Sequence, residues 1–145
     1  MSFRFETLLR LRKNEENAIQ RDMGQINTHL YRQQENLETL ETFTRQARDG
    51  YKQTLAENPD VRRLVLYDRF FDSSRTGRLR QNQVIAEIEK RAEEKRGELA
   101  EAMKRRRIFE ILKERDWMKR KKEQQRLETA LMDEVAASRW KGERP

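Results

Sequence analysis

Apolar residues recur along the first part of the chain at alternating steps of four and three residues, and this spacing strongly constrains the fold. The mean step of 3.5 residues is that of a coiled-coil seam and not of a β-strand. We therefore expect one long helix whose apolar stripe must be covered by a partner helix. The seam positions are Phe5, Leu9, Arg12, Glu16, Ile19, Met23, Ile26, Leu30, Gln33, Leu37, Leu40, Thr44, Ala47, Tyr51 and Thr54.

The composition points to the same class of protein. Ala, Glu, Lys, Leu and Arg make up about half of the 145 residues, as is typical of long helices and coiled coils. Glycine occurs five times and proline twice. A sandwich, a barrel or an α/β enzyme needs many turns and a thick core, and this chain has material for neither. The sequence predicts a single all-α domain, residues 1–145.

A break near the middle of the chain separates two helical segments. Asn58 suits the N-cap of a second helix, Pro59 its first position and Asp60 the positive end of its dipole. The segment 72–77, Asp-Ser-Ser-Arg-Thr-Gly, is a candidate for an irregularity within that helix. The 3.5-residue spacing then returns at Gln81, Ile85, Ile88, Ala92, Lys95, Leu99, Ala102, Arg106 and Phe109.

The seam indicates where the chain reverses direction. A turn at 58–59 pairs residues whose numbers sum to about 117, so that the two apolar stripes cover each other. A turn near residue 75 would lay the first stripe against the polar segment 113–126. We therefore predict a long antiparallel two-helix coiled-coil hairpin, with helix one at about 4–57, a turn at 58–59 and helix two at about 60–139.

Positive charge is concentrated where the partner helix runs out. In the predicted register Phe5 lies beside Leu112, so helix two projects beyond helix one. The segment 104–126 carries eleven Lys and Arg and four acids, a balance equal to the formal net charge of +7 of the whole chain. Such a block is either a solvated face or a contact for an acidic partner or polyanion.

The basic segment does not resemble a nucleic-acid or membrane site. Acidic residues interrupt it, and Phe109 and Trp117 are its only aromatic residues, so stacking platforms for bases are scarce. Between residues 113 and 126 it has no apolar stripe, which binding to a membrane surface requires. We expect no nucleic acid and no direct membrane insertion.

The sequence offers no catalytic, metal or cofactor site. Cysteine is absent, and the only histidine, His29, lies one position off the seam. The glycines never cluster into a phosphate-binding loop, and no apolar run approaches the roughly 18–20 residues of a membrane span. The N-terminal residues do not have the pattern of a signal peptide. We expect a cytoplasmic protein that is not an enzyme.

A second candidate surface lies close to the predicted turn. Leu66 and Phe70 are each one position away from the seam, so one thin partner helix cannot bury them together with their apolar neighbours. Phe43 and Tyr51 lie across from them in the predicted register. We call Phe43, Tyr51, Leu66 and Phe70 the hairpin-end patch. It is either a docking surface or the ordinary packing of a hairpin end.

The two ends of the chain carry a family resemblance. The N-terminal end reads Phe-Arg-Phe at 3–5 and Leu-Leu-Arg-Leu-Arg at 8–12, before a long polar coiled coil. The C-terminal end has the basic stretch 119–126, Met-Asp-Glu-Val-Ala at 132–136, and then Arg139 and Lys141. Over essentially its whole length the chain resembles the flagellar export protein FliJ family, and injectisome relatives share this shape. Val135 departs from the family pattern, which often has a bulkier apolar residue there.

The resemblance implies a non-enzymatic component of the flagellar type III export apparatus, peripheral to the inner membrane. The family's hairpin is similar to the central stalk of rotary ATPases, and its terminal end is thought to sit in the hexameric export ATPase ring and promote its assembly and activity. In the family, the mid-chain region meets the membrane export gate protein, so the resemblance implies this role for the hairpin-end patch. Escort of free export chaperones is also ascribed to the family. The ring-facing candidates are Phe5, Leu8, Leu11, Lys119, Arg120, Arg126, Asp133 and Glu134.

Two other functions are open at this point. A generic coiled-coil scaffold or chaperone would dimerise through the same apolar stripe, whereas a hairpin predicts a monomer. A basic nucleic-acid binder would show salt-sensitive retention on DNA.

Overall fold

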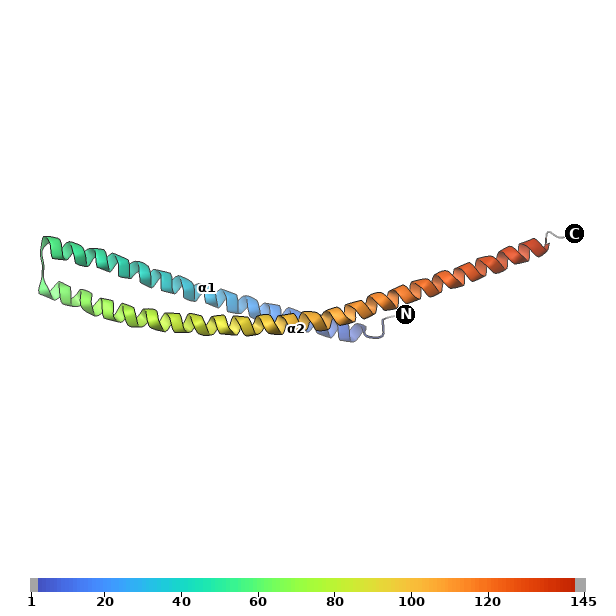
Figure 1. Cartoon of the computed structure of the whole chain (residues 1–145), viewed down its shortest axis with the longest axis horizontal. Helices are drawn as coiled ribbons and strands as arrows, with labels where there is room; N and C mark the ends of the chain where they lie inside the picture. The colour runs from blue at the N-terminus through green and yellow to red at the C-terminus, as the bar shows by residue number, and fades with distance from the viewer. Residues whose placement is uncertain (1–2, 143–145) are drawn as a thin grey trace. The chain divides into compact units, whose positions relative to one another are not determined.

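The computed structural model describes residues 3–142 and contains two long α-helices, α1 (Glu6–Glu57) and α2 (Val61–Gly142). They pack against each other as an antiparallel hairpin in which α2 is the longer helix (Figure 1). The predicted all-α hairpin is therefore confirmed. The described residues divide into two compact units, residues 3–17 with 100–142, and residues 18–99. The assignment of the whole chain to a single domain stays a prediction.

The N-cap of the second helix lies two residues later in the chain than the sequence predicts. The backbone N–H of Asn58 still donates to the carbonyl of Thr54, so Asn58 belongs to the end of α1. The carboxylate of Asp60 accepts a hydrogen bond from the backbone N–H of Arg62 at 3.1 Å. Asp60 is therefore the N-cap of α2, because its carboxylate satisfies one of the first N–H groups of the helix.

In the unit 18–99 the two stripes cover each other in the predicted register. Ile88 is 4% exposed and Ala92 only 1%. The side-chain amide of Gln81 donates to the carbonyl of Gln33 at 2.9 Å. Their residue numbers sum to 114, close to the sum of about 117 that the seam predicts. The seam positions of both helices, across both units, are all buried or half-buried. Burial of one thin stripe therefore holds each unit together.

Residues 72–77 are α-helical throughout, so the irregularity considered from the sequence is absent. Ser74 in this segment is only 6% exposed. A Cβ atom placed on Gly77 would lie 3.4 Å from the Leu40 side chain, so α1 approaches closely here. Packing between the helices outweighs the weak helix propensity of these small residues.

Two glycines in the unit 18–99 are expected to lower the stability of their helices, and no neighbouring atom requires a glycine at either position. Nothing lies within 4 Å of a Cβ placed on Gly24 or Gly97, so Gly24→Ala and Gly97→Ala should each stabilise the helix by about 1 kcal/mol. A Cβ on Gly50 would lie 2.6 Å from the Tyr67 hydroxyl, so Gly50→Ala should gain much less. Thermal unfolding followed by circular dichroism compares the three variants, and equal stabilisation by all three would contradict the packing of Tyr67.

Candidate functional site

The start of α1 is fixed against α2 within the unit formed by 3–17 and 100–142. The ring centroids of Phe5 and Phe109 lie 6.0 Å apart, and Lys113 Nζ lies 3.0 Å from Glu6 Oε2. Leu9 is 2% exposed and packs one turn further along α1. The partner helix therefore begins beside residues 109–113 of α2, close to the position that the seam predicts.

A cluster of charged side chains crosses the seam in this unit. Arg106 Nε lies 2.5 Å from Glu16 Oε2, and Arg106 Nη1 donates to Glu110 Oε1 at 2.6 Å. Glu16 is only 7% exposed. The hydrogen bond from Arg106 lowers the pKa of Glu110, and the same bond raises the pKa of Arg106. The cluster ties the start of α1 to the middle of α2 by charge as well as by apolar contact.

The pKa of Glu110 predicts how this cluster responds to acid. Because the pKa is lowered in the folded state, the ionised carboxylate stabilises the fold, and this contribution is lost as the pH falls through the folded-state value. Glu110→Gln should therefore lose less stability than the unmodified chain between pH 7 and pH 3. Urea unfolding at the two pH values measures the difference. Glu89→Gln, at an exposed carboxyl outside the ion pairs of residues 3–142, is the control and should behave like the unmodified chain.

α2 continues past the start of α1 as a helix without a neighbour in this unit (Figure 1). Every residue from 117 to 142 is exposed, whereas Asp116 is still half-buried. We call residues 117–142 the extension. At 1.5 Å per residue it is about 40 Å long. Trp117 and Met118 still line a pocket with Leu9 and Lys13 of α1, and the side chains that follow them on the extension are exposed.

The charges of the extension are only partly neutralised within the chain. Arg120 Nε lies 3.2 Å from Asp116, Arg126 Nη2 lies 2.7 Å from Glu123, and Lys121 Nζ lies 5.0 Å from the centre of the Trp117 ring. The hydrogen bond between Arg126 and Glu123 raises the pKa of the arginine and lowers that of the glutamate. In the part of the chain that the structure describes, Lys119 and Lys122 make no ion pair, so their charges are available to an acidic partner.

The structure shows an apolar feature that the sequence analysis missed. Leu127, Leu131 and Val135 are 56%, 61% and 45% exposed and follow one another at four-residue steps. Each such step turns by about 40° around a helix, so the three side chains lie within an arc of about 80°. We call them the terminal stripe. The repeated step of four residues is its signal in the sequence, and it lies beyond the segment 113–126, which has no apolar stripe.

The predicted ring-facing residues fall into two groups. Phe5 is half-buried against Phe109, whereas Leu8 and Leu11 are 39% and 48% exposed on the outer side of α1. The remaining five lie on the extension and are all exposed. Asp133 and Glu134 lie about 30 Å along α2 from the residues that face the start of α1, at 1.5 Å per residue. The structure does not bring the two groups together.

The hairpin-end patch in the unit 18–99 is partly assembled. Tyr51 packs against Phe71, with ring centroids 5.9 Å apart, and Phe71 packs against Phe70 at 6.1 Å. Leu66 and Phe70 are 64% and 38% exposed, and Phe43 is 54% exposed one turn before Ala47 on α1. An open groove of about 430 Å³ runs beside them. Its lining consists of Ala47, Arg63, Leu66, Tyr67 and Phe70.

The described part of the chain provides little for other kinds of site. Among residues 3–142, no three or more His, Cys, Asp or Glu side chains gather in a way that could hold a metal ion. Neither described helix contains a stretch apolar and long enough to span a bilayer.

Comparison with known proteins identifies one family. The family model described as flagellar FliJ protein matches the chain over residues 1–145. No curated protein and no solved structure matches it.

Proposed function

Since the chain belongs to the FliJ family of flagellar proteins, we propose that it is a stalk-like subunit that binds within the export ATPase ring and promotes its assembly and activity. Membership of the family implies a component of the flagellar export apparatus, and the family is generally non-catalytic. The observation that supports the finer proposal is the extension, a single helix on which every side chain from 117 to 142 is exposed.

The extension has the dimensions and the chemistry of an insert in a narrow protein channel. A single helix with its side chains is about 10–12 Å wide. Lys119 and Lys122 offer free positive charge, and the terminal stripe offers apolar contact. Long-range attraction between the basic end and an acidic ring would favour encounter, and the apolar contacts would slow release. The chain would then bias the subunits of the ring without taking part in ATP hydrolysis.

The hairpin-end patch is the proposed contact for the membrane export gate protein and for export chaperones. Leu66 and Phe70 leave apolar surface exposed beside an open groove, which is the usual character of a docking site. In this arrangement the extension contacts the ATPase and the patch contacts the gate. The protein would act at the cytoplasmic face of the inner membrane, peripherally bound to the export apparatus.

The alternative, a scaffold that dimerises through the apolar stripe, finds less support. The structure buries the seam between α1 and α2 of one chain, with Leu9, Ile88 and Ala92 at most 4% exposed. Little of that stripe is left for a second copy. Sedimentation equilibrium should give the 17.7 kDa mass of one chain. A stable dimer would favour the scaffold instead.

A charge reversal on the extension tests the proposed function. The purified protein is added to the export ATPase, and hexamer formation and ATP hydrolysis are followed. Reversal of Lys119, Arg120, Lys121 and Lys122 to Glu should weaken the stimulation about tenfold or more, since each lost contact to an opposite charge costs about 1.5–3 kcal/mol. Helicity should stay nearly unchanged, because these side chains are exposed.

A matched variant controls for the loss of net charge. It reverses Arg21, Arg32, Lys52 and Lys90, four exposed cations of the unit 18–99, and should stimulate the ATPase like the unmodified chain. If the unmodified protein affects neither hexamer formation nor hydrolysis, the proposed function is wrong. If the extension variant stimulates normally, the basic residues have no part in it.

A further inference from the structure

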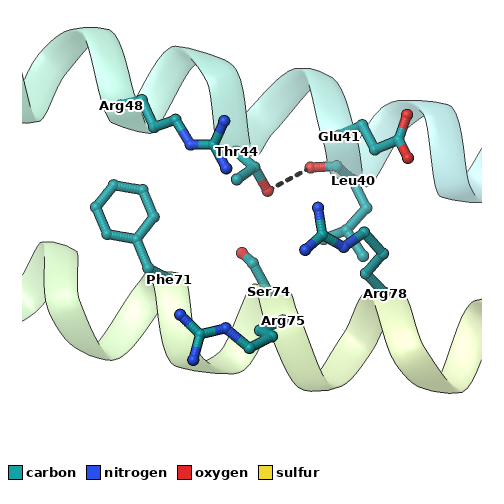
Figure 2. A pocket seen from close by; sticks show the side chains of 8 residues that line it. All are labelled: Leu40, Glu41, Thr44, Arg48, Phe71, Ser74, Arg75 and Arg78. Carbon is teal, nitrogen blue, oxygen red and sulfur yellow. Dashed lines mark hydrogen bonds between the residues drawn. The ribbon is translucent and has the colours of Figure 1, made fainter.

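A second charged feature lies between the helices of the unit 18–99, away from the extension. A pocket of about 250 Å³ opens between α1 and α2 (Figure 2). Arg48 lines it from α1, and Arg75 and Arg78 line it from α2. In Figure 2 the Arg78 guanidinium group extends toward α1, whereas that of Arg75 lies along α2. We call it the arginine pocket. Its lining consists of Leu40, Glu41, Thr44, Arg48, Phe71, Ser74, Arg75 and Arg78.

The three guanidinium groups lack carboxylate partners. Within residues 3–142, Arg48, Arg75 and Arg78 take part in no ion pair, although Glu41 lines the same pocket. All three side chains are exposed, and together they give the mouth of the pocket a positive charge that would attract an anion.

A buried hydroxyl group points into the same pocket. Ser74 is 6% exposed, and its Oγ has no hydrogen-bond partner. Figure 2 shows this oxygen directed from α2 toward α1, with the Arg48 and Arg78 guanidinium groups extending into the same space. The neighbouring hydroxyl of Thr44 is already used, since it donates to the carbonyl of Leu40 at 2.8 Å. A buried hydroxyl without a partner is costly, and a bound acceptor would satisfy it.

We propose that the arginine pocket binds a carboxylate side chain of a partner protein, held by Arg48, Arg75 and Arg78 and by a hydrogen bond from the Ser74 hydroxyl. Guanidinium groups match the planar, two-oxygen geometry of a carboxylate. The apolar walls, Leu40 and Phe71, suit the methylene groups of a glutamate, whereas a free phosphate would leave them uncovered. This proposal goes beyond the proposed function and does not depend on binding to the ATPase.

A titration of the full-length protein tests the proposal. The probe is N-acetyl-glutamate methylamide, and N-acetyl-glutamine methylamide is its uncharged counterpart. Nuclear magnetic resonance follows the backbone amides of Thr44 and Ser74 and the Nε–H groups of the arginines. The glutamate probe should shift these signals in a saturable way, and the glutamine probe should not. The absence of localised shifts, or shifts only in segment 104–126, would overturn the proposal.

Inorganic phosphate is titrated in parallel to separate the two kinds of anion. Weaker binding of phosphate than of the glutamate probe supports a carboxylate site. Tighter binding of phosphate would refute the assignment to a carboxylate. The comparison is made at one ionic strength, so that general attraction to a basic protein is the same in both titrations.

Two sets of variants identify the groups responsible. Replacing Arg48, Arg75 and Arg78 with Gln should weaken binding of the glutamate probe about tenfold, as expected for loss of charge-assisted hydrogen bonds. The control replaces Arg32, Arg80 and Arg91 with Gln, an equal loss of charge at exposed positions outside the pocket, and should leave binding unchanged. Equal weakening by both triple variants would contradict a specific site.

The Ser74→Ala variant should have opposite effects on stability and on binding. Removing a buried hydroxyl that has no partner should raise the melting temperature of the free protein by about 2–4 °C. The same change should weaken binding of the glutamate probe several-fold, because the hydrogen bond to the carboxylate is lost. Unchanged binding would refute the role assigned to the hydroxyl.

Discussion

Replacing Ile88 with alanine is expected to lower the free energy of unfolding by about 2–5 kcal/mol. Ile88 is 4% exposed in the middle of the covered stripe of the unit 18–99. With only two helices, no further layer of side chains can move in to fill the space that the substitution leaves. Unfolding in urea, followed by circular dichroism, measures the loss.

Val84 provides the matched control for this prediction. It lies one turn before Ile88 on the same helix but is 38% exposed. Val84→Ala removes apolar atoms of the same type from a partly solvated position, and alanine is the better helix former, so the net change should be within about 0.5 kcal/mol. A similar loss for both variants would mean that the seam does not carry the stability of this unit.

Arg106→Ala is expected to destabilise the protein by about 3 kcal/mol, because it leaves Glu16 buried without its cation. Glu16 is 7% exposed, and Arg106 is its ion-pair partner. Replacing both residues with Met should recover most of the loss, since a buried ion pair of this kind is often no better than apolar side chains of similar size. Urea unfolding of Glu16→Met, of Arg106→Met and of the variant that carries both changes measures the coupling.

Arg126→Ala separates this effect from the loss of a surface ion pair. Arg126 pairs with Glu123 on the exposed extension, with both side chains more than half exposed. Such pairs contribute about 0–1 kcal/mol, so the free energy of unfolding should hardly change. If Arg106→Ala were equally mild, the charge cluster at Glu16 would have no structural importance.

The fold was predictable because one physical requirement dominates it. A stripe repeating every 3.5 residues must be covered, and with Asn58-Pro59-Asp60 as the break a single register covers it. Lys95 lies 3.5 Å from Asp22, and their numbers sum to the predicted value. The N-cap was harder to predict, because Asn58 and Asp60 are both good caps and only the local backbone selects Asp60.

The candidate sites were less predictable because they depend on contacts between helices. The basic segment and the projecting end of α2 follow from counting residues along the chain. The arginine pocket does not, because Arg48 comes from α1 and Arg78 from α2, and a sequence does not show which arginines remain without acids. Ser74 lies in a segment of weak helix propensity, yet it is helical and only 6% exposed, and the sequence alone does not show this burial.

The extension also has a consequence for symmetry. A ring of six identical subunits repeats every 60° about its axis, whereas a single helix has no rotational symmetry. The terminal stripe covers an arc of about 80°, so it could face one or two subunits at a time, and the others would meet charged or polar side chains. In the proposed complex, an extension seated on the axis of the ring would therefore make the contacts of six identical subunits unequal.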